Sequence, residues 1–264
     1  MIDRIVFIGA GNLATQLALA LSEKGVRIQQ VYSRTVESAQ RLAQKVNADF
    51  TNDLSLVLKD AGMYIIAVKD AAIEQVVKGM DIQAGSVIVH TAGSIPMDIL
   101  SGLTINYGVF YPLQTFSVDR KADFSTIPLC LEASNPALLA QLYQLAQRIS
   151  SSIHMISSQE RKTLHLAAVF ANNFVNHLYW AAGEILQQSG LDFDLLKPLI
   201  RETAEKVQTM TPLEAQTGPA RRNDRQVISN HLIMLESQPE LQKIYSFVSE
   251  SITHIHQKHN NDLL

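Results

Sequence analysis

Residues 5–21 read IVFIGAGNLATQLALAL and decide the fold of the chain. An apolar run leads into Gly9 and Gly11, and a helical pattern of apolar residues follows, so that the spacing is G-x-G-x-x-A. In such a strand–turn–helix unit the first glycine permits the tight turn, the second lets the backbone approach a pyrophosphate, and Ala14 lets the helix pack close to the strand. The N–H groups that begin the helix favour a bound anion. We therefore expect a dinucleotide site, with a ligand-free glycine turn as the alternative, and its first residues are Gly9, Ala10, Gly11, Asn12 and Leu13.

The end of the second expected strand indicates which dinucleotide binds. An NAD site usually ends this strand with Asp or Glu, whose carboxylate bonds the ribose hydroxyls. This chain instead has Ser33, Arg34 and Thr35, with no carboxylate to repel a 2′-phosphate. The planar guanidinium of Arg34 can hold a phosphate through two hydrogen bonds, and the two hydroxyls add donors. We expect NADP rather than NAD as the cofactor, and a solvated loop arginine is the alternative for Arg34.

Short β-branched runs alternate with helical stretches over the first half of the chain. Alternation of this kind predicts a parallel sheet with helices on both faces. The expected strands cover residues 4–8, 28–32, 63–68, 86–90 and 108–111. The expected helices cover residues 13–24, 36–45, 54–58 and 72–80. The far edge of the sheet would be formed by a strand, a helix and a strand over residues 128–133, 136–149 and 152–156.

From about residue 157 the pattern becomes helical throughout. The expected helices cover residues 158–188, 193–210, 224–235 and 239–259, with a loop over 211–223. Ser189-Gly190 supplies a stop signal for the first of them. We therefore predict an α/β fold in two domains. A Rossmann-type doubly wound, mostly parallel sheet covers residues 1–156, and an all-helical C-terminal domain covers residues 157–264.

The composition bounds the class of protein. The 264 residues carry a formal net charge of −3, and 47% are hydrophobic and 18% charged, which fits a globular protein and gives no sign of nucleic-acid binding. The longest apolar stretches are interrupted by Asn, His or Glu, so we expect no membrane span. Cys130 is the single cysteine, and we expect it to be a small buried apolar residue in a reducing compartment. With no signal-peptide pattern before the first strand, we expect a cytoplasmic protein.

Four motifs, taken in order, resemble those of a known family. His90-Thr91-Ala92-Gly93-Ser94 ends an expected strand, and GVFYPLQTF follows at residues 108–116. HLAAVFANNF at 165–174 opens the helical domain, and GPARRND at 218–224 precedes a later helix. Together these motifs resemble Rossmann-like proteins with a DUF2520 C-terminal domain. The first domain resembles the NADP-binding half of pyrroline-5-carboxylate reductases and of F420-dependent NADP reductases.

This resemblance implies a reductase-like architecture, often dimeric through its helices, and supplies no substrate. The chain departs from the family pattern at two positions. Tyr111 stands where histidine is frequent, and Asn223 stands where glycine is frequent.

The first helix of the second domain supplies the expected proton donor. Hydride transfer needs positioning and one proton donor or oxyanion partner. The resemblance implies His165 as the proton donor, with Asn173 orienting a polar substrate group. Histidine suits this role because its charge state changes near neutral pH. On a helical wheel, however, His165 shares a stripe with Arg161, Lys162 and Asn172, so a solvated face of an amphipathic helix is the alternative.

Other expected contacts follow from the edge at which open α/β sheets bind ligands. Gln114 and Thr115 come just after a strand and are expected to bind substrate, with a rigid proline turn as the alternative. Arg222 is a candidate clamp for a substrate carboxylate, with an exposed loop arginine as the alternative. Three more residues follow strand ends and are expected beside the cofactor, namely Ala67, Val68 and Thr91.

Two functions from different classes remain open. The first is an NADP-dependent oxidoreductase acting on a small polar carbonyl, imine or hydroxy acid in a cleft between the domains. The second is a non-catalytic NADP-binding sensor or partner protein. The chain has no Tyr-x-x-x-Lys and no P-loop sequence, which excludes the short-chain dehydrogenase arrangement and a P-loop nucleotide site.

The sequence also predicts which further cofactors, metals and partners to expect. Coenzyme F420 enters only by family analogy. No metal is expected, because neither Cys nor Glu completes the histidines near the C-terminus. The long apolar helices indicate more burial than a monomer offers, so we expect a homodimer.

Overall fold

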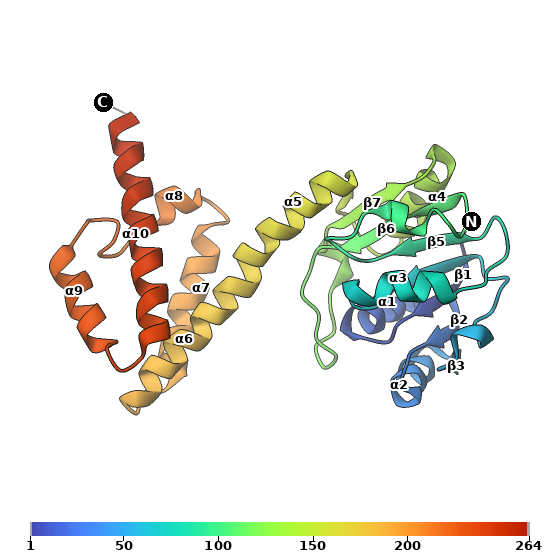
Figure 1. The fold of residues 1–264 in the computed structure, drawn as a ribbon, viewed down its shortest axis with the longest axis horizontal. Helices are drawn as coiled ribbons and strands as arrows, with labels where there is room; N and C mark the ends of the chain where they lie inside the picture. Colours follow the sequence, from blue (N-terminus) through green and yellow to red (C-terminus); the bar gives the residue numbers. More distant parts are fainter. Residues whose placement is uncertain (1, 263–264) are drawn as a thin grey trace. The chain divides into compact units, whose positions relative to one another are not determined.

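The computed structural model describes residues 2–262, and its first part is built on an eight-stranded sheet in the order β3-β2-β1-β4-β5-β6-β7-β8 (Figure 1). Neighbouring strands run parallel except β6 and β7, which pair antiparallel. This is the doubly wound, mostly parallel sheet that the sequence predicted. The strands are β1 Arg4–Ile8, β2 Arg27–Tyr32, β3 Asp49–Thr51, β4 Met63–Ile66, β5 Val87–His90, β6 Asn106–Pro112, β7 Leu129–Ala133 and β8 Ile153–Met155.

Alternate residues of the central strands feed two separate apolar cores. The helical elements around the sheet are α1 Asn12–Glu23, α2 Val36–Val46, η1 Leu54–Leu56, α3 Asp70–Gly79, η2 Met97–Leu100, η3 Phe124–Thr126 and α4 Pro136–Gln147. Ile5 and Phe7 of β1 share a core with α1, α2 and α4. Val6 and Ile8 belong to the other core, with α3 and η2. Because successive strand residues point to opposite faces, helices cover both faces of the sheet.

The sheet differs from the sequence expectation at one edge. Strand β3 was not expected, because Asp49–Thr51 is short and its Phe50 is exposed, so no apolar run marks it. The stretch expected as a helix over 54–58 is a single 3-10 turn, η1, whose first N–H groups are capped by the Asp53 carboxylate. At the other edge β7, α4 and β8 form the far side of the sheet, as predicted.

The helical part begins after β8 and contains one interruption of regular α-helix. The long helix expected over 158–188 runs as α5, then a π-helical segment, then α6. The expected loop over 211–223 is wrong in one respect, because Thr211 and Glu214 form a capping box that starts the short helix α8. The elements are α5 Ser158–Ala168, the π-helix Val169–Phe174, α6 Val175–Gln188, η5 Phe193–Leu196, α7 Lys197–Lys206, α8 Pro212–Ala215, α9 Arg225–Met234 and α10 Pro239–Asp262.

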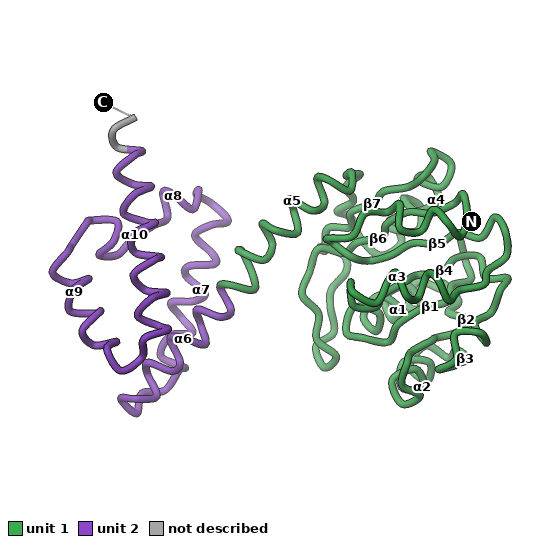
Figure 2. The backbone as a smooth tube through the Cα atoms, in the orientation of Figure 1, with its two compact units in different colours: residues 1–174 green, residues 175–264 purple. Residues whose placement is uncertain are grey.

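The chain divides into two compact units (Figure 2), residues 1–174 and residues 175–264. The change from sheet to helix comes earlier, between Met155 and Ser158, close to the predicted domain boundary at 156/157, which stays a prediction. Within residues 2–262 the structure shows no helix both long and apolar enough to cross a membrane. The sheet, α5 and the π-helix all belong to the first unit, and so do both cavities described next.

Candidate functional site

The two glycines of the first turn have different surroundings. Gly9 has φ +124°, and its N–H donates to the Tyr32 carbonyl at 2.8 Å. A Cβ on Gly9 would lie 2.2 Å from the Ala67 carbonyl oxygen, so no side chain fits. Gly11 has φ −77° and begins α1, and a Cβ there would meet no atom within 4 Å. The first glycine is therefore required by the fold, whereas the second faces open space.

This open space is a cavity of about 670 Å³ at the carboxyl ends of β1, β2 and β4. Helix α1 begins beside it with no side-chain cap and no acidic residue in its first turn, which leaves its N–H groups for an anion. Within residues 2–262 Arg34 forms no ion pair, and its guanidinium is available to a ligand. Eight of the expected cofactor residues line the cavity: Gly9, Ala10, Gly11, Ser33, Arg34, Thr35, Ala67 and Val68.

Seven lining residues were not among the expected ones, Lys69 and Gln75 among them, and three expected residues lie outside the lining. Lys69 and Gln75 border the cavity from the start of α3 and from within it. Lys69 directly follows Val68, so its position after a strand was the available signal. Leu13 lies in the first turn of α1. The Asn12 amide donates to the Phe116 carbonyl at 2.9 Å, and the Thr91 N–H donates to the Ile66 carbonyl at 3.1 Å.

A second cavity of about 540 Å³ lies beside the carboxyl end of β6. It brings together four residues expected to bind or react with substrate, and it adds Tyr111. The Gln114 side chain accepts a hydrogen bond from the Thr115 N–H at 2.8 Å. The lining of this cavity contains no Lys, Arg, Asp or Glu, so its polar groups are amides, hydroxyls and one imidazole. The expected residues are Gln114, Thr115, His165 and Asn173.

The π-helix places two asparagines at this cavity. A π-helix bonds i to i+5, so each residue turns through a smaller angle than in an α-helix. Asn172 and Asn173 both lie in this segment, and both line the cavity with His165. The helical wheel, which assumes 3.6 residues per turn, separated Asn173 from His165 because it could not include this interruption. Single-turn π segments inside α-helices occur frequently at functional sites.

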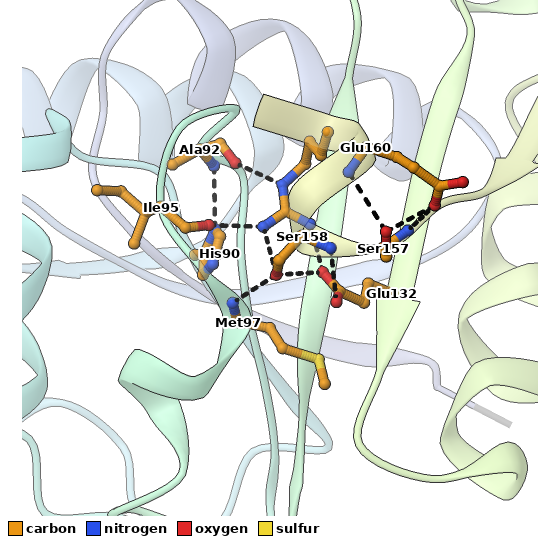
Figure 3. A network of polar contacts seen from close by, with 9 residues as sticks. His90, Ala92, Ile95, Met97, Glu132, Ser157, Ser158 and Glu160 are labelled. Atoms are coloured by element: carbon orange, nitrogen blue, oxygen red, sulfur yellow. Dashed lines mark hydrogen bonds and ion pairs between the residues drawn. The ribbon is translucent and has the colours of Figure 1, made fainter. Parts of the chain in front are cut away.

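Arg161 does not fit the alternative of a solvated helix face, because its side chain is fully buried, whereas Lys162 and Asn172 are exposed. The guanidinium forms an ion pair with Glu132 and donates to the carbonyls of Ala92 at 3.2 Å and Ile95 at 2.6 Å. Ser158 connects the same groups, since its hydroxyl donates to Glu132 and accepts from the Met97 N–H (Figure 3). The start of α5 is thereby fixed to β7 and to the segment after β5.

His90 lies in the same network and is buried (Figure 3). Its Nδ1 accepts from the Ala92 N–H at 3.1 Å, and within residues 2–262 its Nε2 has no hydrogen-bond partner. Burial, with the positive charge of Arg161 second, lowers the pKa of His90 to about 4, so the ring is neutral at pH 7. Cys130 is buried as expected, and burial raises the pKa of its thiol.

The remaining expected residue belongs to the second unit. Arg222 is exposed in the turn before α9, and the neighbouring Arg221 donates to the Gln216 carbonyl at 2.7 Å. Asn223 has φ +51°, and the Asp224 side chain caps α9. Over residues 2–262 no cluster of three His, Cys, Asp or Glu side chains could hold a metal ion.

Comparison with known proteins supports the two-part organisation. Residues 4–93 match the family described as NADP oxidoreductase, coenzyme F420-dependent, and residues 127–252 match the domain of unknown function DUF2520. A solved structure described as a candidate NADP oxidoreductase, BF3122 from Bacteroides fragilis, is 50% identical over 96% of this chain and 98% of that chain, with a TM-score of 0.92. None of the proteins with curated descriptions matches significantly.

Two more distant structures share the fold. Protein TM1727 from Thermotoga maritima is 23% identical over 96% of this chain and 98% of that chain, with a TM-score of 0.80. The 1-pyrroline-5-carboxylate reductase from Streptococcus pyogenes is 13% identical over 95% of this chain and 98% of that chain, with a TM-score of 0.61. The predicted likeness to such reductases is therefore confirmed at the level of the fold.

Proposed function

We propose that this chain, which belongs to the same family as the candidate NADP oxidoreductase BF3122, transfers hydride between NADP and a small polar carbonyl, imine or hydroxy acid. The observation that carries the proposal is that one edge of one sheet borders two cavities. One holds the glycine turn and Arg34, and the other holds His165 with neutral polar groups.

The sheet topology supports a single extended ligand across this edge. Strands β1, β4, β5 and β6 are consecutive neighbours and parallel, so their carboxyl ends meet at the same edge. From β1 to β6 there are three strand spacings, roughly 14 Å in total at about 4.8 Å each. An extended dinucleotide with its pyrophosphate at Gly11 covers such a distance, so that its nicotinamide end comes toward the cavity beside β6.

Charge supports NADP over NAD. Arg34 and Lys69 are the two cations lining the first cavity, and no carboxylate lines it. Ser33 and Thr35 add hydroxyl groups beside Arg34, and the Thr35 side chain makes no cap bond to α2. Cations and hydroxyls around the adenosine ribose favour the form that carries a 2′-phosphate.

Each of the four expected residues in the second cavity has a defined part in this proposal. Bound NADPH supplies the hydride, and the protein supplies orientation and one proton. His165 gives that proton to the substrate oxygen or nitrogen, and Asn173 orients a polar substrate group. Gln114 and Thr115 bind the substrate from the segment after β6.

A cofactor titration and a turnover assay test the proposal. NADPH and NADH are titrated against the purified protein by intrinsic fluorescence, and NADPH is expected to bind at least about tenfold more tightly, because a charge-assisted phosphate contact contributes about 1.5–3 kcal/mol. Arg34→Gln is expected to abolish this preference, whereas Arg41→Gln, an exposed position on α2, leaves it intact. Equal or tighter NADH binding would contradict the cofactor assignment.

Turnover separates the oxidoreductase from the binding-protein alternative. NADPH absorbance is followed with a panel of 2-keto acids and cyclic imines, and NADP reduction is followed with 2-hydroxy acids. An oxidoreductase oxidises NADPH in the presence of at least one member, with a rate that depends on His165. Tight NADPH binding without oxidation by any member would favour a non-catalytic NADP sensor or partner protein.

A further inference from the structure

His165 is held on two sides by groups that the sequence analysis did not connect to it. Its Nδ1 lies 3.2 Å from the Tyr111 hydroxyl, and the two rings meet edge-on at 69°. On the other side the ring packs against the backbone at Gly93, where a Cβ would lie 2.5 Å from Nδ1 and 2.7 Å from Cγ. The imidazole therefore occupies a slot between β6 and the segment after β5.

The hydroxyl of Tyr111 is a proton donor under ordinary conditions. Burial raises the pKa of Tyr111 to about 12, so the phenol is protonated at neutral pH. A neutral imidazole has one ring nitrogen that accepts and one that carries the proton. A phenol that donates to Nδ1 requires the tautomer whose proton is on Nε2.

We propose that Tyr111 is a positioning residue that holds His165 in the Nε2–H tautomer, with Nε2 presented to the cavity beside β6. The catalytic part of this proposal rests on the proposed function. As the substrate carbon gains hydride, its oxygen takes the Nε2 proton, and Nδ1 takes the proton of the Tyr111 hydroxyl. The imidazole stays neutral, and the resting state returns when Nε2 takes a proton from water and Nδ1 gives its proton back to the tyrosinate. Tyr111 thus acts through His165, whose Nδ1 lies beside its hydroxyl.

The tautomer is measured in the resting protein, without any substrate. Two-dimensional ¹⁵N–¹H spectra distinguish protonated from unprotonated ring nitrogens, and the spectrum of His165→Gln identifies the His165 signals by their loss. We expect an unprotonated Nδ1 and a protonated Nε2 in the wild type. Tyr111→Phe is expected to produce a mixture of tautomers, and Tyr107→Phe is expected to leave the wild-type pattern. A protonated Nδ1 in the neutral wild-type ring would overturn the proposal.

Tyr107 is a matched control because it lies on the same strand, β6, and also loses only a hydroxyl. Its hydroxyl lies 3.4 Å from Asp98, outside the lining of the cavity beside β6. The Tyr107→Phe variant therefore tests whether losing any tyrosine hydroxyl from β6 changes the tautomer of His165. Because the wild-type spectrum alone decides the tautomer, the test does not depend on how well Tyr111→Phe folds.

Kinetics test whether Tyr111 acts through His165. With a substrate from the panel, Tyr111→Phe is expected to lower kcat about 10–100-fold with little change in KM, because a group aligning a general acid acts on the transition state. In the His165→Gln background the same change is expected to have no further effect. An equal loss in both backgrounds would overturn the proposal. If no substrate is turned over, the proposed function fails while the tautomer remains decided by the spectra.

Discussion

At the scale of single residues, Gly9 and Gly11 separate the needs of the fold from those of a ligand. Gly9 combines a positive φ with the Ala67 backbone oxygen at 2.2 Å from any added Cβ, and Ala67 directly follows β4, the strand that pairs with β1. Gly11 meets neither condition. Gly11 is the N-cap of α1 and faces the first cavity, so its lack of a side chain agrees with the proposed close approach of a dinucleotide.

Substitution by alanine tests this division. Gly9→Ala is expected to reduce the free energy of unfolding by about 3 kcal/mol or more, since a positive φ costs a residue with a Cβ about 1–3 kcal/mol and the clash with Ala67 adds to it. Gly11→Ala is expected to change stability by less than about 1 kcal/mol and to weaken NADPH binding at least about tenfold. Urea unfolding and fluorescence titration measure the two effects. Unchanged NADPH affinity in a folded Gly11→Ala protein would contradict the ligand role.

The burial of Arg161 could not be predicted from the sequence. A charged residue in a helix with Lys162 and His165 nearby is normally solvated, and periodicity could not reveal otherwise. Its burial depends on Glu132, 29 positions earlier, and on carbonyls exposed by the segment after β5. The positions of the glycine turn and of Arg34 at the first cavity, by contrast, could be predicted because each lies within a local strand–turn–helix unit, and their binding roles stay predictions.

At the scale of elements, the sequence predicted the elements with strong periodicity and missed those set by tertiary context. The buried strands and α1 to α4 have apolar patterns that determine their type. Strand β3 has no such pattern and exists because it pairs with β2. The π-helix at 169–174 follows from no local signal in HLAAVFANNF, yet it decides which asparagines face the second cavity.

The buried histidine at the end of β5, His90, predicts that the stability of the protein depends on pH. Folded His90 has a pKa of about 4, below the ordinary 6.5 of the unfolded chain, so the unfolded state binds more protons between these values. The contribution of His90 to stability is complete above pH 6.5 and falls by about 3 kcal/mol as the pH drops to 4. The His90→Asn protein is expected to be less stable at pH 7, and its free energy of unfolding is expected to lack this part of the dependence on pH.

Urea unfolding between pH 7 and pH 4 measures the slope in both proteins. Carboxylates contribute equally to each, so the difference between the two curves isolates His90. His154→Asn serves as the control, because His154 is exposed and its loss should leave the wild-type slope. Parallel curves for the wild type and His90→Asn would contradict the buried, neutral histidine.

At the scale of the whole molecule, the second unit leaves much of its apolar surface uncovered. Its buried apolar cluster holds Ala181, Leu235 and Leu241, which is small for about 90 residues. Large side chains on several of its helices are more than half exposed, including Leu199 on α7 and Phe247 on α10. An exposed apolar surface of this kind is typical of an interface, and a second copy of the chain is the partner that the predicted homodimer supplies.

A dimer covering these side chains makes a measurable prediction. Light scattering after size exclusion is expected to give twice the chain mass of 29.2 kDa at micromolar concentration. Leu199→Glu combined with Phe247→Glu is expected to raise the dissociation constant at least about 30-fold, because burying an anchor side chain contributes about 2 kcal/mol or more and a buried carboxylate opposes association. Gln257→Glu adds one negative charge, as each of the two substitutions does, at an exposed polar position of α10 and should leave the mass unchanged. A wild-type protein that has the mass of one chain at every concentration would refute the homodimer, and the uncovered apolar surface would then require a different partner.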